Sequence, residues 1–282
     1  MQPLYIIILG SLIASCCALL GCFLLLRKMT MLGDAIAHAV LPGIVISYIV
    51  SGERDHTAML IGATVAGLLT TFSIEFLSKK IKLQQDAATG VMFTGFFAIG
   101  VILISLFANK IDLDQDCVLY GEIGYLGLYN DAFIPIEIWR MLIILGLIIT
   151  FIVLGYRQLL MTTFDLAFAS SVGIMGALWQ YLLMGFVSLT TVASFESVGS
   201  ILVVSFLIIP PAAAYLITHS LQRMLIYACL IGIIGAISGY YLAVFLDSAI
   251  AAAMSVACGV ELILIFIYVK LWKERVLSKA VY

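Results

Sequence analysis

The sequence predicts an all-α, polytopic membrane protein of about eight or nine transmembrane helices. Charged residues make up only 11% of the 282, and hydrophobic residues make up 64%. A soluble domain would carry roughly a quarter charged residues to cover its surface. Apolar runs of about 18 or more residues recur with short polar breaks between them, and such runs are long enough to cross a bilayer. The composition and the recurring runs together indicate a chain that crosses the membrane many times.

Nine apolar segments are the expected spans, and eight spans remain an alternative. They lie near 4–26, 35–50, 57–77, 87–108, 138–156, 174–193, 197–218, 224–246 and 250–270. The first has no basic stretch before it and no convincing small-residue cleavage site, so we expect a retained span rather than a signal peptide. No internal repeat, low-complexity tract or linker divides the segments. Residues 1–282 are therefore expected to form a single domain.

The distribution of Lys and Arg predicts which ends of the spans face the cytoplasm, because these residues stay preferentially on that side. With nine spans and the N-terminus outside, eleven of the fourteen Lys and Arg residues fall inside. The inner ones are Arg27, Lys28, Lys79, Lys80, Lys82, Arg157, Arg223, Lys270, Lys273, Arg275 and Lys279, and the outer ones are Arg54, Lys110 and Arg140. A merged span would reverse the later loops and weaken this asymmetry, which favours nine crossings.

The long outer connection, 109–137, is acidic and aromatic. Its acids are Asp112, Asp114, Asp116, Glu122, Asp131 and Glu137. An acidic extracytoplasmic vestibule could raise the local concentration of cations. An ordered loop whose acids merely face water explains the same composition, so both interpretations stay open.

The long inner connection, 157–173, reads RQLLMTTFDLAFASSVG. Thr163 or Asp165 could cap a short cytosolic helix there, and Gly173 could end it. The apolar side chains of Phe164, Leu166 and Phe168 are too few to span a membrane. A short helix that carries them is expected to lie in a groove, either on the inner surface of this protein or on a partner.

One stretch places an acid and an imidazole inside an expected span. In MTMLGDAIAHAVLPG, residues 29–43, Asp34 and His38 stand four residues apart and therefore share one helix face. An ionised Asp near the bilayer centre costs at least ~2.5 kcal/mol, so such residues generally line a path or find a partner. Carboxylate oxygen and imidazole nitrogen suit Mn²⁺, Fe²⁺ or Zn²⁺. Two ligands are too few for one ion, but a two-fold pair of subunits would supply four.

A structural interpretation of the same pair is an internal Asp–His hydrogen bond that locks two helices. Pro42 shifts the balance, because it removes the amide that would bond to the carbonyl of His38. Gly33 and Gly43 flank the segment and allow close approach or bending. Opened backbone at membrane depth is tolerated where it lines a cavity or is covered by protein. The combination favours a pathway.

Two further features are weaker candidates for a gate or pathway. Pro210 and Pro211 free the carbonyls of Phe206 and Leu207 and should bend or widen their span. A hinge or cavity wall is one interpretation, and a simple packing kink is the other. Glu196 lies at the outer end of the same region and is a candidate gate residue.

Motifs of catalytic and redox chemistry are missing from the sequence. No G-x-x-x-x-G-K-[ST] occurs, so ATP hydrolysis, if it drives transport, must take place on another polypeptide. No H-E-x-x-H or G-x-S-x-G supports an intramembrane hydrolase. The six cysteines include no C-x-x-C pair, which argues against a disulfide framework or thiolate metal site. We expect a protein that is not itself an enzyme and holds no permanent cofactor.

RKMTMLGDAIAHAVLPGI closely resembles the signature segment of the metal-ion (ABC-3) family of ABC transporter permeases, which import manganese, zinc or iron. QQDAATGVMFTGFFAIGVILIS, DLDQDCVLYGEIGYL, FDLAFASSVGI and SFESVGSILVVSFLIIPPAAAYLI are similar to other parts of that family, so the likeness covers nearly the whole chain. The chain departs from the family after Asp247, where members often show Pro and Gly. It also has Asp165-Leu166 where many members have Asp-Pro.

The resemblance implies a complete transporter of several chains. Two permease subunits would form the pore, two cytosolic ATP-binding subunits would drive it, and an extracytoplasmic metal-binding protein would deliver the ion. Asp34 and His38 match the family's metal ligands. The coupling segment matches Phe164, Asp165, Phe168 and Gly173. Residues 157–173 then form the cytosolic coupling segment of the permease domain, and 109–137 its extracytoplasmic loop.

We therefore expect a permease subunit of an ATP-driven importer of divalent transition metals in the bacterial plasma (inner) membrane. Membrane lipid surrounds such a subunit, and nucleic acid is not an expected partner. One alternative is a proton-coupled secondary carrier in which Asp34 and His38 relay protons. Another is a non-transporting membrane scaffold or receptor in which the pair is only structural. The ligand types do not choose among manganese, iron and zinc, and the sequence does not choose between a homodimer and a heterodimer.

Overall fold

The computed structural model describes residues 2–51, 56–107, 135–218 and 220–280, with 2, 56–57, 196 and 272–280 described as backbone only. Its described residues form helices and no strands. The helices are α1 (Gln2–Leu26), α2 (Leu32–Ala39), α3 (Leu41–Ser51), α4 (His56–Lys80), α5 (Gln85–Phe107), α7 (Ile136–Phe164), α8 (Leu166–Ser171), α9 (Gly176–Val198), α10 (Ser200–Ile217), α11 (Leu221–Leu246) and α12 (Ile250–Ala280). Most of the outer connection, up to residue 134, lies outside the described residues, so its role as a vestibule stays a prediction.

Nine stretches of the described chain are long and apolar enough to cross a membrane. They correspond one by one to the nine expected segments, and α2 and α3 together make the second, Leu32–Ser51. The short helix α8 lies outside all nine. The prediction of an all-α protein with about nine spans is confirmed. The described residues contain nine candidate spans, one more than the eight-span alternative.

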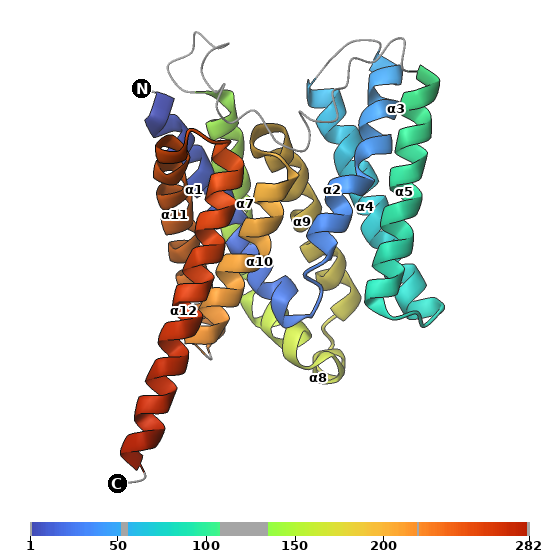
Figure 1. The fold of residues 1–282 in the computed structure, drawn as a ribbon. Coiled ribbons are helices and arrows are strands. Elements are labelled where there is room, and N and C mark those ends of the chain that lie inside the picture. The colour runs from blue at the N-terminus through green and yellow to red at the C-terminus, as the bar shows by residue number, and fades with distance from the viewer. Residues whose placement is uncertain (1, 52–55, 108–134, 219, 281–282) are drawn as a thin grey trace.

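The spans form two groups joined by α9 (Figure 1). In one group α1 contacts α7, α10 and α11, and α12 contacts α10 and α11. In the other, α5 contacts α2, α3 and α4. Helix α9 touches members of both groups, including α1, α2, α4, α7 and α10. Helix α1 is the most enclosed, with Leu9, Ile13, Leu20 and Phe23 fully buried.

Glycines allow the helices within each group to approach closely. A Cβ at Gly21 of α1 would collide with the carbonyl oxygen of Leu207 on α10. A Cβ at Gly239 of α11 would collide with the backbone of Met254 on α12. Because lipid provides no hydrophobic drive for helix association, such close backbone packing is a main source of cohesion between spans.

The two ends of the bundle differ. Figure 1 shows the N-terminus at one end and α8 and the C-terminus at the other. The α8 end is the one that the Lys and Arg distribution predicts to be cytoplasmic. Here α12 continues to Ala280, beyond the expected end of its span near residue 270. Residues 271–280, LWKERVLSKA, contain neither Gly nor Pro, so nothing in them stops the helix where the apolar run ends.

Candidate functional site

Asp34 and His38 lie on α2, one turn apart, as the sequence predicts. Asp34 is in the first turn, where a carboxylate is favoured by the helix dipole, and His38 is in the last turn. The carboxylate Oδ1 and the imidazole Nε2 are 3.7 Å apart, and the two side chains are 52% and 30% exposed respectively. That separation is longer than a hydrogen bond. The pair therefore does not tie two helices together, and both groups keep lone pairs for a further partner.

Aromatic side chains of α5 hold the imidazole. The His38 ring is tilted against Phe93 at a centroid distance of 5.2 Å and stands edge-on to Phe97 at 5.8 Å. Offset and edge-on ring contacts of this kind are favourable and fix the orientation of a ring. Helix α5 therefore positions His38 on α2.

The helix is interrupted at Val40, two residues after His38. Helix α2 ends at Ala39, and α3 begins at Leu41, so that Pro42 is its second residue. The amide of Val40 still bonds to Ile36, and the Val40 carbonyl accepts from Ile44, each at 3.1 Å. Proline is tolerated in the first turn of a helix because its missing N–H would be unpaired there anyway. The interruption expected from Pro42 is thus present, but the helix restarts one residue before the proline.

The flanking glycines hold the segment between two neighbouring helices. A Cβ at Gly33 would collide with the side chain of Leu207 on α10, and one at Gly43 would collide with the backbone of Gly62 on α4. The expected close approach is present at both positions. The start of α2 and the start of α3 are therefore pressed against different helices on either side of the pair.

The weaker gate candidates are only partly described. Pro210 and Pro211 are buried within α10, which continues as one helix from Ser200 to Ile217. The Leu207 carbonyl, which Pro211 leaves without its usual donor, faces Gly21 of α1. Glu196 lies on the backbone of α9, but its side chain is outside the described part of the structure. Roles of these residues and of Pro42 in a pathway stay predictions.

The described residues of a single chain contain no complete metal site. No group of three or more His, Cys, Asp or Glu side chains gathers anywhere in the described residues. The five cysteines among them are free thiols, four of them fully buried. Cys117 lies outside the described residues. The only acid–imidazole pair with donor atoms this close in the described chain is therefore Asp34 with His38.

Only part of the predicted coupling segment, 157–173, forms the short helix α8 (Leu166–Ser171), because residues 157–164 continue α7 as far as Phe164. Of the two expected caps, Asp165 fills the role, because its carboxylate accepts a 2.8 Å hydrogen bond from the amide of Phe168. Gly173, at φ +84°, ends the helix, and the amides of Gly173 and Ile174 bond back to Ser170 and Ala169. This double closure is the Schellman motif, which suits glycine. The leucine that follows Asp165 in place of proline leaves the cap intact.

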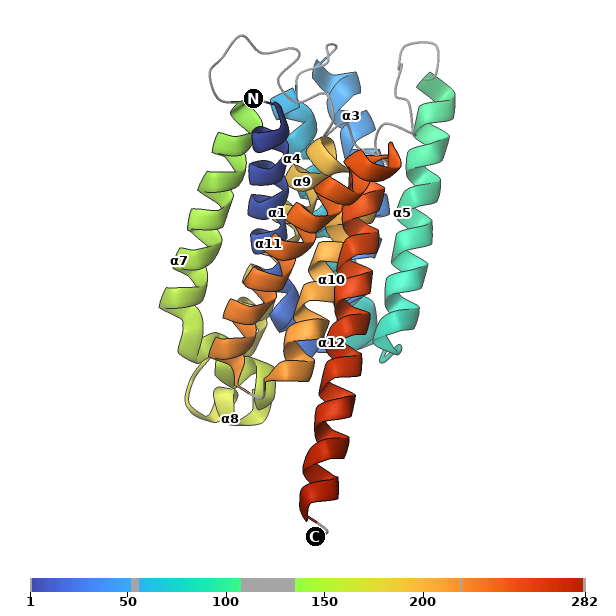
Figure 2. The same cartoon turned by 60° about the vertical axis from the view of Figure 1, so that its left-hand side comes forward.

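Helix α8 and the last residue of α7, Phe164, present apolar side chains outward. Phe164, Leu166 and Phe168 are all more than half exposed, and only Ala169 is buried. Figure 2 shows α8 at the same end as the long α12 extension, beneath the spans. The expected apolar face of the inner connection is therefore present and uncovered in the single chain.

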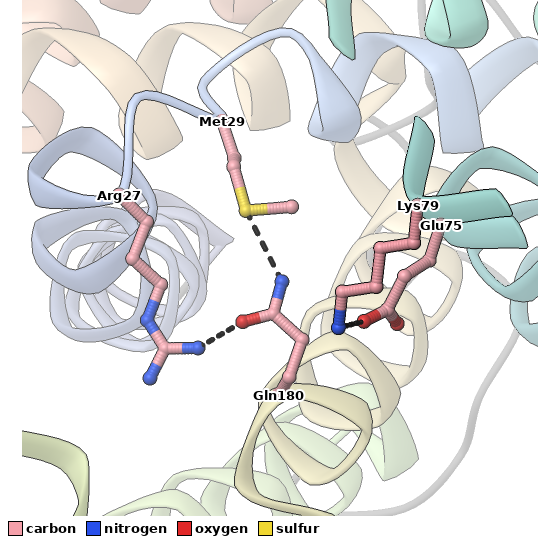
Figure 3. A network of polar contacts seen from close by, with 5 residues as sticks. All are labelled: Arg27, Met29, Glu75, Lys79 and Gln180. Carbon is pink, nitrogen blue, oxygen red and sulfur yellow. Dashed lines mark hydrogen bonds and ion pairs between the residues drawn. The ribbon is translucent and has the colours of Figure 1, made fainter. Parts of the chain in front are cut away.

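Next to α8 lies a polar network centred on Arg27 (Figure 3). Its guanidinium donates from Nε to Thr163 at 3.1 Å, from Nη2 to Thr162 at 3.0 Å, and from Nη1 to the side-chain oxygen of Gln180. The amide nitrogen of Gln180 donates in turn to the sulfur of Met29 at 3.3 Å. Burial lowers the pKa of Arg27 to about 10, although the nearby carboxylate of Glu75 opposes that change. Arg27 stays charged at neutral pH.

Glu75 and Lys79 form an ion pair one turn apart on α4, beside this network. Glu75 is 8% exposed and lines a cavity of about 70 Å³, together with Met29, Gln180 and Met184. The sequence holds a signal for part of this arrangement, because an acid inside an apolar span with Lys four residues later marks a paired site. It holds none that joins Arg27 to threonines and a glutamine 135 to 153 residues further along the chain.

Residues 4–270 match the ABC 3 transport family. The chain is 44% identical over 261 residues to the manganese transport system membrane protein MntD of Bacillus subtilis, covering 91% of this chain and 88% of that one. It is 38% identical over 267 residues to the zinc transport system membrane protein TroD of Treponema pallidum, covering 93% and 73% respectively.

Among solved structures, PsaBC from Streptococcus pneumoniae in complex with Fab superposes with a TM-score of 0.77 at 30% identity, over 93% of this chain and 90% of that one. The sequence match and the structural match each span nearly the whole chain. The chain therefore belongs to the ABC 3 transport family and is a multi-pass protein of the bacterial plasma membrane.

Proposed function

We propose that this protein is the permease subunit of an ATP-driven importer of divalent transition metal ions. In the proposed transporter, Asp34 and His38 of two permease subunits hold the passing ion between them. The observation that most directly supports this proposal is the incomplete ligand set: two donor groups lie on one face of α2, and the described chain has no third ligand near them. The relatives named for manganese and zinc transport support the choice of cargo.

The exposure of Asp34 supports a second subunit. Slightly more than half of this side chain is uncovered in the single chain, within a span that crosses the membrane. A carboxylate left facing lipid would cost at least ~2.5 kcal/mol. Helix α5 beside it is also almost wholly uncovered along its span. A second permease against this face would cover the acid and bring a matching Asp and His to it.

The donor set defines the class of ion. Two carboxylates and two imidazoles from a pair of subunits fill a tetrahedral shell, and water ligands extend it to six. Manganese, iron and zinc all accept such ligands. The site is a station on a path, so the metal is cargo and not a resident cofactor.

The energy source in this proposal is a separate pair of cytosolic ATP-binding subunits. The exposed apolar side chains of Phe164, at the end of α7, and Phe168, on α8, suit a groove on such a subunit. Asp165 and Gly173 fix the two ends of α8 and so hold Phe168 in place. An extracytoplasmic metal-binding protein would deliver the ion on the other side. The whole chain, 1–282, acts as one permease domain.

The test is metal uptake by the assembled transporter in vesicles. The complex, with its ATP-binding subunits, is placed in proteoliposomes with ATP at the cytoplasmic face, and manganese uptake is measured. Asp34→Asn should lower ATP-dependent uptake by at least about 100-fold, because losing a direct ligand exceeds the 10–100-fold cost of changing an outer-shell partner. The stability of the protein should not fall, because Asp34→Asn removes a charge from an apolar environment.

Asp247→Asn is the matched control. It is the same chemical change at an exposed acid with a left-handed backbone, which Asn tolerates. Uptake by this variant should equal that of the unchanged protein. Normal uptake by a well-folded Asp34→Asn/His38→Ala double variant would end the proposal. Uptake that needs a proton gradient and no ATP-binding subunit would favour the secondary carrier instead.

A further inference from the structure

Arg27 links the end of the helix before α8 to the helix after it. The guanidinium holds Thr162 and Thr163, in the last turn of α7, and Gln180 near the start of α9. Only Phe164 separates Thr163 from Asp165, the residue that caps α8. A displacement of α8 therefore acts directly on the oxygen atoms that Arg27 binds.

The other end of the network reaches the connection into α2. Met29, which accepts from Gln180, lies between α1 and α2. Its amide bonds to the carbonyl of Leu24 at 2.9 Å, and its carbonyl accepts from the amide of Leu32 at 3.2 Å. Met29 is thus fixed by its backbone to the end of α1 and to the first residue of α2. The same short helix carries Asp34 and His38.

The connection between α1 and α2 has a defined backbone conformation, so a movement of one end displaces the other. Lys28 has a left-handed backbone at φ +58° and ends α1 with the same two back-bonds that end α8. Arg27 is the residue immediately before it, so the guanidinium is anchored at the point where the chain turns toward α2. Sideways motion of Gln180 would reach α2 through one hydrogen bond and this turn.

The acceptor oxygens of Thr162, Thr163 and Gln180 are neutral, which distinguishes this network from a rigid ion-pair lock. Hydroxyl and amide oxygens make weaker bonds to a guanidinium than carboxylates do. The planar guanidinium of Arg can bond to all three oxygens at once, whereas the single ammonium group of Lys cannot. Such a set can break and re-form as α7, α9 and the α1–α2 connection shift relative to one another.

The adjoining cavity does not suit a second cation site. Its carboxylate, Glu75, already pairs with Lys79, and the Arg27 cation lies close enough to act on it electrostatically. The oxygen of Gln180, which also lines the cavity, is bonded to Arg27. The local charge of these groups is positive, so a divalent ion would be repelled here.

We infer that Arg27 and Gln180 are positioning residues that transmit movement of α8 to the metal-bearing helix α2. This inference rests on the proposed function, since it assumes that α8 receives the ATP-binding subunit. It assigns a task to groups that lie neither at the Asp34–His38 pair nor on α8. In this inference, movement of α8 shifts the connection between α1 and α2.

The test measures manganese uptake and ATP hydrolysis together on the assembled transporter in proteoliposomes. The variants are Arg27→Lys, Gln180→Leu and Thr163→Val, of which the last removes one acceptor while keeping the side-chain shape. Arg157→Lys is the matched control, because Arg157 is an exposed cation on α7 near the same end. Uptake per ATP hydrolysed should fall at least about tenfold for Arg27→Lys and Gln180→Leu, since each loses one or more hydrogen bonds. It should fall less for Thr163→Val and not at all for Arg157→Lys.

A second readout separates transmission from a purely structural role. The amount of manganese retained by the complex should stay unchanged in all the variants, because Asp34 and His38 are intact. Wild-type uptake per ATP in Arg27→Lys and Gln180→Leu would overturn the inference. A parallel fall in thermal stability, hydrolysis and metal retention, in Thr163→Val as well, would also overturn it. If the unchanged complex itself shows no ATP-dependent uptake, the proposed function fails, which is a distinguishable result.

Discussion

The Asp34–His38 pair and the Arg27 network are both polar groups in a charge-poor chain, but their donors and acceptors are used differently. Asp34 and His38 are 3.7 Å apart and partly exposed, and the described residues provide no third ligand. Arg27 is largely buried, and its guanidinium donates to three side chains. In an apolar environment an unsatisfied polar pair is costly and points to a missing partner, whereas a satisfied set points to a structural or mechanical task.

The two regions also differ in the contacts that orient their side chains. His38 is held by ring contacts from α5, which leave its nitrogen atoms available. Arg27 is held by hydrogen bonds, which occupy the nitrogen atoms themselves. Packing can therefore orient a side chain while its donor and acceptor atoms stay available, whereas hydrogen bonding orients a side chain by occupying those atoms.

The largest expected effect on stability lies at the satisfied network. Arg27→Met should lower the free energy of unfolding by about 3 kcal/mol, because it removes several hydrogen bonds to a charged group and leaves their acceptors without the donor. Thermal unfolding of the purified protein in detergent measures this. Arg157→Met, at an exposed position, should stay within about 0.5 kcal/mol. An Arg27→Met variant as stable as Asp34→Asn would remove the distinction between the two regions.

A smaller effect is expected at the cap of α8. Asp165→Ala removes the acceptor for the amide of Phe168 and should destabilise α8 by about 1 kcal/mol. Hydrogen exchange at the amides of α8 should accelerate, while exchange in α2 stays unchanged in the isolated permease. Asp165→Asn, which keeps a capping oxygen, should restore most of the protection. Equal exchange in Asp165→Ala and the unchanged protein would show that α8 is held by packing alone.

The smallest effect is the response of the network to pH. Burial lowers the pKa of Arg27 from its ordinary value to about 10, so the folded state disfavours the charge. The resulting penalty is fully present below the folded pKa and is relieved only as the pH rises from about 10 toward the unfolded value. The stability difference between the unchanged protein and Arg27→Met should therefore be constant from about pH 6 to 9. Unfolding curves at several pH values check this, and a slope in that range would contradict the assigned charge state.

The sequence alone predicted most of the fold, because the relevant signals are local. A long apolar run forms a helix in lipid wherever it lies, since its backbone groups can bond only within the segment. Residues four apart share a helix face, so the spacing alone placed Asp34 and His38 together. The cap and the terminal glycine of α8 could be predicted from adjacent residues. Two helices depart from the expected bounds: α7 continues to Phe164 and α12 to Ala280, because helix propensity does not stop at the membrane surface.

What only the tertiary structure decided is which helices meet and which side chains they bring together. The seating of His38 on Phe93 and Phe97, and the bonds from Arg27 to Thr162, Thr163 and Gln180, join parts of the chain that no periodicity connects. Each span is stable as a helix by itself, and in lipid the choice of neighbour depends on small residues and shape complementarity rather than on hydrophobic burial. The sequence therefore determined a membrane-spanning chain with one acid–imidazole pair on a single helix face. The packing of its helices determined that the pair stays partly exposed and that its helix is tied to the end of α7 beside α8.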